Sequence, residues 1–306
     1  MSPLPTSPGS AADRESQAVP VLLVLGGIVS VQFGAAVAKG LFDALGPAGT
    51  VLVRVATAAV VLVAAARHPL RHVPARSRGL VAAFGLVLAA MNLAFYLSLE
   101  RIPLGVAVTI EFVGPLAVAV AGSRRPRDLL WAVLAAAGVL LLTGGGRALV
   151  SGQLDPRGVL FAAMAGTCWA GYILLNQRVG AAVPGVHGLA VAMVVGAVAL
   201  LPLGVASAGT QLLNPSLLAA GAAVGLLSSA VPYTLELAAL RRLATSTFGV
   251  LMSLEPAVAA LAGLVLLGEH LTAAQAVAVA LVCVASAGAT WTAAGERRRA
   301  RADLTP

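Results

Sequence analysis

Short polar breaks divide the sequence into apolar segments of about 20 residues, the length that a helix needs to cross ~30 Å of hydrocarbon. Pro, Gly or Arg stands in these breaks, as in LGPAG at 45–49 and SRRPRD at 123–128. The predicted spans are 20–38, 47–66, 78–98, 102–122, 128–145, 157–176, 186–206, 216–239, 244–267 and 272–293. Because a helix satisfies its own backbone hydrogen bonds in lipid, this pattern predicts an all-α, polytopic membrane protein with ten transmembrane helices.

The composition excludes a soluble fold. Hydrophobic residues make up 59% of the 306 residues and charged residues 10%, with a mean hydropathy of +0.95, whereas soluble domains carry about 25% charged residues. The net charge of +8 does not indicate a nucleic-acid partner, because the arginines stand in the breaks between spans. Cys168 and Cys283 lie within spans, and we expect free thiols there.

The Lys and Arg residues are divided unequally between the two sides of the membrane. If the N-terminus is cytoplasmic, the cytoplasmic side holds Arg14, Arg67, Arg71, Arg76, Arg78, Arg124, Arg125, Arg127, Arg178, Arg241, Arg242, Arg297, Arg298, Arg299 and Arg301. The opposite side holds only Lys39, Arg101, Arg147 and Arg157. By the positive-inside rule, we expect a multi-pass protein of the bacterial inner membrane with both termini cytoplasmic.

The ten spans fall into two halves of five. A shift of 141 residues places 99–122 on 240–263 with six identities in 24 positions, among them Pro115 with Pro256. Because five is an odd number, the second half must be inverted relative to the first, as in many secondary transporters. We expect 1–18 to be a disordered cytoplasmic tail and no cleaved signal, 19–146 and 156–294 to be the two halves, and 295–306 to be a basic cytoplasmic tail.

Four ionisable side chains fall within spans, where each costs about 2.5–3.5 kcal/mol at the helix centre on insertion scales. They are Arg54, Glu111, Glu236 and Glu255. Glu111 stands four residues before Pro115, and Glu255 stands one residue before Pro256. A proline opens a helix locally, which is tolerated where the helix lines a cavity. We therefore predict that these carboxylates face a central cavity as substrate or proton sites.

Each candidate also has a purely structural interpretation. Glu111 or Glu255 could pair with Arg54 to hold the bundle together, and Glu236 could extend to the membrane interface. The uncharged polar candidates are Gln32, Asn92, Tyr96, Tyr172, Asn176, Tyr233 and Ser253, and hydrogen bonding between helices is the alternative for each. Asn92 and Tyr96 are four residues apart and share one helix face. Trp169 is expected in ordinary packing or at the interface.

The sequence contains no motif of a soluble or metal-dependent enzyme. TGGGR at 143–147 lacks the Lys and Ser/Thr of a phosphate loop, and Pro69 places His68 and His72 in a loop. No Cys/His/Asp cluster has metal spacing, and no GxSxG, HExxH or ATP-binding cassette occurs. We therefore expect a protein that is not an enzyme and uses no metal or cofactor, driven by ion or solute gradients.

Several segments resemble the EamA branch of the drug/metabolite transporter superfamily. They are MNLAFYLSLERIPLGVAVTIEFVGPLAVAV (91–120), SRRPRDLLW (123–131), CWAGYILLNQRVG (168–180), VPYTLELAALRRLATSTFGVLMSLEPAVAAL (231–261) and LGEHLTAAQ (267–275). EFxGPLAVA and SLEPAxAA are similar to its amino-acid exporter subgroup, whereas GExLT is general in the superfamily. The first half has GSRRPRD where GExLT is expected. The resemblance implies ten helices in two inverted halves, and efflux of small amino acids such as threonine or homoserine in exchange for protons.

Together these features predict a secondary transporter in the lipid bilayer that exports a small zwitterionic solute. The glutamates would exchange protons for the substrate ammonium group, and Arg54 or Asn92 would hold its carboxylate, with Tyr96 and Tyr233 on the same inner faces. One alternative is an exporter of drugs or aromatic metabolites, for which 4% aromatic residues are few. The others are an intramembrane enzyme, which needs paired aspartates or metal ligands, and a scaffold, which needs no membrane carboxylates. The coupling ion, stoichiometry and oligomeric state stay open at this stage.

Reporter fusions test the predicted topology. We expect a fusion after Gly209 to report the external side and one after Arg125 to report the cytoplasmic side, because an odd number of predicted spans separates them. Alkaline phosphatase and fluorescent-protein activities measure the two locations. The same side for both fusions would contradict the ten-span assignment.

Overall fold

The computed structural model describes residues 11–121, 128–142, 153–240, 242–243 and 245–302. Its first helices are α1 (Ala11–Lys39), α2 (Phe42–Ala66), α3 (Arg78–Leu99), α4 (Leu104–Glu111), α5 (Val113–Ala121) and α6 (Asp128–Leu142). They are followed by α8 (Pro156–Ala182), α9 (His187–Ala208), α10 (Pro215–Gly225), α11 (Val231–Leu240), α12 (Thr245–Met252), α13 (Glu255–Leu267) and α14 (Ala273–Ala302). Within these residues no strand occurs, so the fold is all-α as predicted.

The helices match the predicted spans closely. In the described part of the chain, nine helical segments are long and apolar enough to cross a membrane. The remaining predicted span, 128–145, corresponds to the shorter apolar helix α6, and positions 143–145 lie outside the described residues. The chain is therefore a polytopic membrane protein.

The N-terminal boundary was predicted wrongly. Helix α1 begins at Ala11, so 11–18 are helical and not part of a disordered tail, while 1–10 lie outside the described residues. The segment AADRESQA consists mostly of strong helix formers, and it continues the apolar helix without a break.

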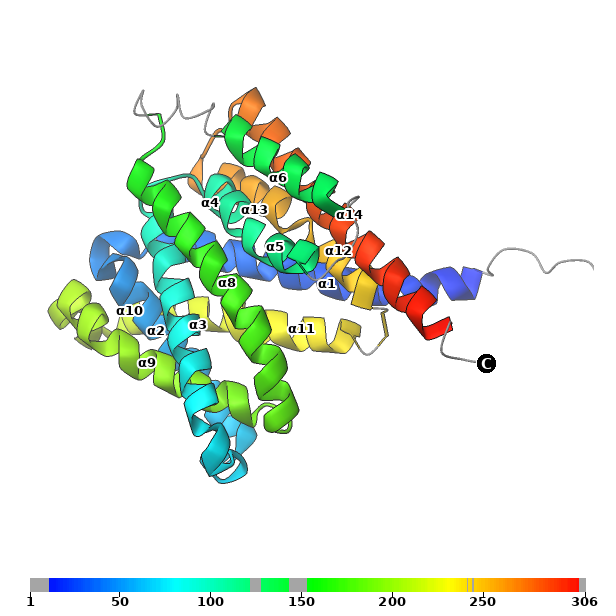
Figure 1. Cartoon of the computed structure of the whole chain (residues 1–306). Coiled ribbons are helices and arrows are strands. Elements are labelled where there is room, and N and C mark those ends of the chain that lie inside the picture. The colour runs from blue at the N-terminus through cyan, green and yellow to red at the C-terminus, as the bar shows by residue number, and fades with distance from the viewer. Residues whose placement is uncertain (1–10, 122–127, 143–152, 241, 244, 303–306) are drawn as a thin grey trace, which may run out of the picture.

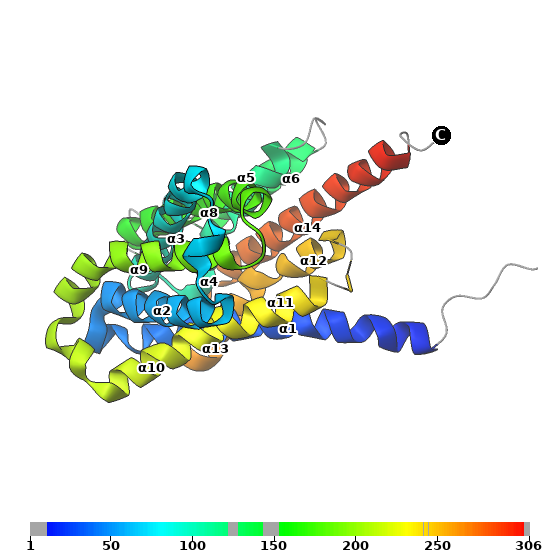
Figure 2. The same cartoon turned by 90° about the horizontal axis from the view of Figure 1, so that it is seen from below.

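Helices that are distant in sequence pack side by side (Figures 1 and 2). Helix α2 packs against α9, α6 against α14, and α4 against α13. Likewise, α3 packs against α8, and α1 packs against α11. When α4/α5 and α12/α13 are each counted as one interrupted span, exchanging the two five-helix halves converts this set of neighbouring spans into itself, which supports the proposed repeat.

The two ends of the bundle are packed differently. Helix α4 packs against α13 where α1 ends and α2 begins, and we call this the closed end. The counterpart pair at the opposite end, α5 and α12, makes at most a slight contact. Figure 1 shows the helices spreading there, with the α2–α3 connection at the bottom and the start of α1 at the right. The bundle is therefore closed at one end and open at the other.

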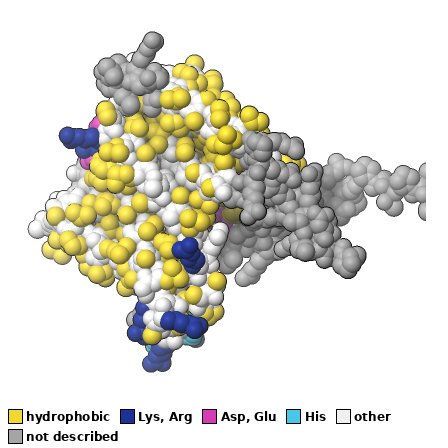
Figure 3. Space-filling view, in the orientation of Figure 1, with side chains coloured by type: hydrophobic (Ala, Val, Ile, Leu, Met, Phe, Trp, Pro, Cys, Tyr) yellow, Lys and Arg dark blue, Asp and Glu magenta, His cyan; other side chains and the backbone are white. Residues whose placement is uncertain are grey.

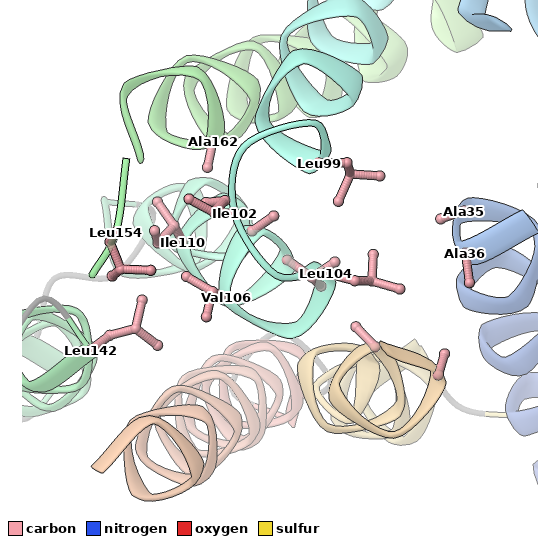
Figure 4. Packing of buried hydrophobic residues seen from close by; sticks show 14 of the residues in the cluster. Ala35, Ala36, Leu99, Ile102, Leu104, Val106, Ile110, Leu142, Leu154 and Ala162 are labelled. Atoms are coloured by element: carbon pink, nitrogen blue, oxygen red, sulfur yellow. The ribbon is translucent and has the colours of Figure 1, made fainter. Parts of the chain in front are cut away.

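An apolar cluster fills the closed end. Leu99, Ile102 and Leu104, from the end of α3 to the start of α4, are almost completely buried. Ala35 and Ala36 of α1 belong to the same cluster (Figure 4). Because lipid tails are as apolar as these side chains, close van der Waals packing, more than the hydrophobic effect, holds the cluster together.

Beside this cluster, one carboxylate joins three segments. Glu269 lies in the GEHLT segment after α13, and its Oε1 accepts a hydrogen bond from Lys39 Nζ at 2.6 Å. Its Oε2 accepts a bond from the Leu104 N–H, in the first turn of α4, at 2.7 Å. Glu269 thus connects α1 and α4 of the first half with α13 of the second half. The GExLT segment of the superfamily pattern therefore has a structural role in this chain.

A second ion pair connects α3 to α8. Arg101 Nη1 donates to Asp155 Oδ2 at 2.9 Å, and Asp155 Oδ1 accepts a bond from the Arg157 N–H at the start of α8. The hydrogen bond from Arg101, followed by that from the Arg157 backbone, holds the pKa of Asp155 below its ordinary value. The contribution of ionised Asp155 to folding stability is therefore present at neutral pH, and it is lost as the pH falls through that depressed pKa.

The outer surface suits a bilayer. Apolar side chains predominate among the coloured side chains of the face in Figure 3. Val60, Leu140 and Trp291 are among the large apolar side chains that are exposed. Lys and Arg gather at the lower tip of the molecule (Figure 3), where the α2–α3 connection lies. The arginines of that connection, Arg67, Arg71, Arg76 and Arg78, are exposed. An apolar belt bounded by a basic tip is the pattern of a membrane-spanning bundle.

Replacing Glu269 with Gln tests the connection at the closed end. The amide keeps an acceptor for the Leu104 N–H but removes the partner charge of the partly buried Lys39. We expect a loss of about 1 kcal/mol, which corresponds to a melting temperature lower by roughly 2–4 °C in detergent. The control is Glu100→Gln, because Glu100 makes only an exposed contact of 3.6 Å with Arg101. Equal melting temperatures for the two variants would contradict the assignment.

Candidate functional site

Three membrane helices are interrupted near their middles. Helix α4 ends at Glu111 and α5 begins at Val113, and α12 ends at Met252 before α13 begins at Glu255. Between α10 and α11, a π-helical segment spans Leu226–Ala230. The predicted openings near Pro115 and Pro256 are confirmed. Such interruptions alter the regular backbone hydrogen bonding at membrane depth, which is tolerated only beside a cavity or within protein.

The three interruptions border one cavity of about 250 Å³. Both halves of the chain contribute to its walls. The lining residues are Val31, Gln32, Ala35, Arg54, Met91, Asn92, Phe95, Val108, Glu111, Trp169, Tyr172, Ser228, Pro232, Glu236, Met252 and Glu255. The structure therefore brings the four predicted ionisable residues together at one site.

The carboxylates of this cavity are shielded from lipid. Glu111 and Glu255 are 7% and 6% exposed, and Glu236 is partly buried beside Gly27 of α1. Glu255 lies within electrostatic range of both other glutamates, and Glu111 lies within range of Arg54. The Glu236 side chain lines the cavity and does not extend to the membrane interface, as its structural alternative had it. The four residues form one electrostatic cluster.

Arg54 is held by neutral groups. Its Nη1 donates to Tyr96 Oη at 3.2 Å, its Nη2 donates to the Ser228 carbonyl at 3.4 Å, and its guanidinium lies 5.4 Å from the centre of the Tyr96 ring. Among the described side chains, no ion pair joins Arg54 to a glutamate. The structural alternative, in which a glutamate pairs with Arg54 to hold the bundle, is therefore not formed. A guanidinium has five N–H donors, and these two hydrogen bonds use two of them. Arg54 can therefore also donate to a ligand.

The uncharged candidates are divided between the cavity and the helix contacts. Asn92 lines the cavity while its Nδ2 donates to the Leu88 carbonyl at 2.8 Å. Tyr96 is completely buried behind Arg54 and does not line the cavity. Tyr233 belongs to α11, but its side chain lies outside the described part of the chain. Ser253 bonds to Ser286 between two helices, as its structural alternative predicted.

Some lining residues were not singled out from the sequence. Trp169, expected in packing or at the interface, lines the cavity and packs edge-to-face on Phe112 with ring centres 5.4 Å apart. Ser228 is brought to the cavity by the π-helical segment, which no sequence pattern indicated. Met91 and Met252 resemble any other apolar residue of a span. Only their positions relative to the interrupted helices distinguish them.

A close helix crossing fixes the backbone at Glu111. Helix α8 passes so near that a Cβ at Gly166 would lie 2.6 Å from the Glu111 carbonyl oxygen. A Cβ at Gly114 would in turn meet the Gly166 backbone. Small residues at such crossings let two helices approach in lipid. The position of Glu111 therefore depends on glycine at 166.

A helical membrane bundle with interrupted helices around a charged central cavity is the architecture of a secondary transporter. The model of the EamA-like transporter family matches residues 156–291. The chain is 43% identical over 290 residues to the threonine/homoserine exporter RhtA of Salmonella typhimurium, covering 94% of this chain and 96% of that protein. It is 42% identical, with the same coverage, to RhtA of Escherichia coli K12. The chain belongs to the EamA-like transporter family.

Two more distant similarities agree with this assignment. An uncharacterized transporter of Bacillus subtilis, YwfM, is 30% identical over 161 residues, which cover 52% of this chain and 53% of that protein. A protein of known crystal structure superposes with a TM-score of 0.59 at 20% identity, covering 90% of this chain and 99% of that chain. At this identity the structural match supports the fold alone.

Two substitutions on α8 test how Glu111 is positioned. Gly166→Ala places a methyl group against the Glu111 carbonyl, and we expect overpacking to destabilise the protein by about 1–3 kcal/mol. Gly180→Ala on the same helix meets nothing within 4 Å, so it should be neutral or stabilise by roughly 0.5–1 kcal/mol. Thermal unfolding in detergent measures both. A Gly166→Ala variant as stable as Gly180→Ala would contradict the close crossing.

Proposed function

We propose that this protein is an inner-membrane exporter of small amino acids, threonine and homoserine among them, that works in exchange for protons and has no enzymatic activity. The main observation in support of the proposal is the cavity beside the interrupted helices, which is lined by Arg54 and three glutamates. Such a site offers a cation for a substrate carboxylate and anions for its ammonium group. The names of the RhtA relatives support the substrate class.

The size of the cavity favours small solutes over drugs. Pockets for drug-sized ligands have volumes of ~300–1,000 Å³, and this cavity measures about 250 Å³. Trp169 and Tyr172 add aromatic surface from α8, and apolar side chains such as Met91 and Met252 line the cavity beside its charged groups. The alternative function, export of drugs or aromatic metabolites, would need a wider cavity.

In this proposal the glutamates carry the protons. Each ionised carboxylate in the cavity can bind either a proton or the ammonium group of the substrate. A proton entering from outside would displace the substrate, and release of the proton inside would restore the site. Glu111 and Glu255 are suited to this exchange because both lie at helix interruptions and are buried away from lipid.

The proposed orientation places both termini and the open end in the cytoplasm. It rests on the excess of arginines in the α2–α3 connection and in the other breaks of that side. The cavity would then receive substrate from the cytoplasm, while the closed end faces outward. The same argument assigns the two inverted halves, 19–146 and 156–294, to opposite orientations in the membrane.

Neutralising the glutamates tests the exchange. Glu111→Gln and Glu255→Gln keep the shape of the side chain but remove the charge that binds a proton or an ammonium group. We expect at least one variant to insert normally and to lose tenfold or more of pH-gradient-driven threonine transport, as roughly 1.5–3 kcal/mol per charge-assisted contact implies. Labelled amino-acid flux in proteoliposomes, with and without an imposed pH gradient, measures this.

Glu100→Gln, the same substitution at an exposed residue just after α3, is the matched control and should transport normally. Full transport per molecule in both cavity variants would refute the proposed proton sites. Reduced protein levels with unchanged transport per molecule would instead indicate a purely structural role for the two carboxylates.

A further inference from the structure

Gln32 is the cavity residue whose polar group the proposed exchange does not use. It lies on α1, lines the cavity and is only 2% exposed. Its Oε1 atom is buried without a hydrogen-bond partner in the described part of the chain. An amide left unsatisfied inside a membrane protein costs free energy. A bond between helices, the structural alternative for Gln32, is absent from the described residues.

A second polar atom of the same cavity is also unsatisfied. The Oγ of Ser228 is buried and has no partner among the described groups, although the Ser228 carbonyl accepts a bond from Arg54. Ser228 stands in the π-helical segment that packs against α1, where a Cβ at Gly34 would meet its side chain. Gln32 and Ser228 therefore come from two neighbouring elements and line one cavity together with Arg54.

The remaining part of an amino-acid substrate is its side chain. Arg54 suits the carboxylate and the glutamates suit the ammonium group, which leaves the amide of Gln32 and the hydroxyl of Ser228. An amide and a hydroxyl each donate and accept hydrogen bonds, and a substrate hydroxyl does the same. The nearest lining residues on α1, Val31 and Ala35, offer no polar atoms for such a group.

We propose that Gln32, assisted by Ser228, determines specificity by binding the side-chain hydroxyl of a small hydroxy amino acid. This inference rests on the proposed export of small amino acids and adds the group that selects among them. A site built to bind a substrate hydroxyl strongly rejects an analogue without it, because the polar groups of the site then stay buried and unpaired. An apolar pocket discriminates far less between the same two solutes.

The test compares pairs of solutes of the same shape in proteoliposomes of the full chain. Threonine is compared with valine, in which a methyl group replaces the hydroxyl, and homoserine is compared with norvaline. Both solutes of a pair are supplied together, so their transport ratio does not depend on the amount of folded protein. The variants are Gln32→Leu and Ser228→Ala. The control is Ser253→Ala, because Ser253 is equally buried but bonds to Ser286 outside the cavity.

We expect the unaltered protein to favour threonine and homoserine over their analogues. Gln32→Leu should reduce this preference about ten- to a hundredfold, mainly by slowing transport of the hydroxy amino acids. Ser228→Ala should reduce it less, and Ser253→Ala should leave it unchanged. If Gln32→Leu does not insert, a reduced preference in Ser228→Ala still supports the hydroxyl site.

Other outcomes separate this inference from the proposed function. An unaltered protein that carries valine and threonine equally remains an amino-acid exporter, but the hydroxyl site is refuted. An unchanged preference in both variants, or an equal loss of both solutes in Gln32→Leu, also refutes it. Failure of the unaltered protein to carry any amino acid would overturn the proposed function itself.

Discussion

Every polar group in the middle of this bundle must find its partner within the protein or in a cavity that admits water or a solute, because hydrocarbon offers none. Regular helical hydrogen bonding is interrupted at that depth between α4 and α5, between α12 and α13, and at the π-helical segment before α11. All three border the same cavity, and the buried glutamates lie there too. The cavity is thus the one place in the described structure where broken helices and charges are both tolerated. Of the remaining helices, α2 is kinked at Gly46 near the closed end, and exposed apolar side chains such as Val60 and Leu140 cover the outer surface.

The contrast between the two ends follows from the same architecture. Two inverted halves offer the same packing at either end of the bundle, and alternating access uses it at one end at a time. In this structure α4 and α13 meet, while their counterparts α5 and α12 are apart. Glu269 secures the closed end through Lys39 and the Leu104 N–H. Breaking those bonds is therefore a requirement for any state that opens this end, which links the GExLT segment to alternating access.

The sequence allowed the spans to be predicted because each one is a long apolar run between polar breaks, and this local signal needs no knowledge of neighbours. Glu111 and Glu255 were recognisable for the same reason, because a carboxylate near a proline within an apolar run is also a local signal. The contacts that complete the site depend on helices far apart in the chain. Lys39 and Glu269 are separated by 230 positions, and Trp169 reaches the cavity only because α8 crosses α5 at Gly166. The sequence did not distinguish Gln32 from the other polar residues of the spans. The packing of α1 does, because it leaves the Gln32 Oε1 atom without a partner in the described structure.

The charge balance of the cavity bears on why protons would be coupled to the solute. Three carboxylates and a single guanidinium line it, so full ionisation leaves an excess of negative charge in a medium of low dielectric constant. A zwitterionic amino acid adds no net charge and therefore does not remove that excess, whereas a proton does. In the proposed exchange, the ammonium group of the substrate and a proton nevertheless compete for the same oxygens. A cavity with fewer carboxylates would bind the zwitterion without needing protons, so in the proposed exchange the surplus of glutamates over Arg54 would tie substrate release to protonation.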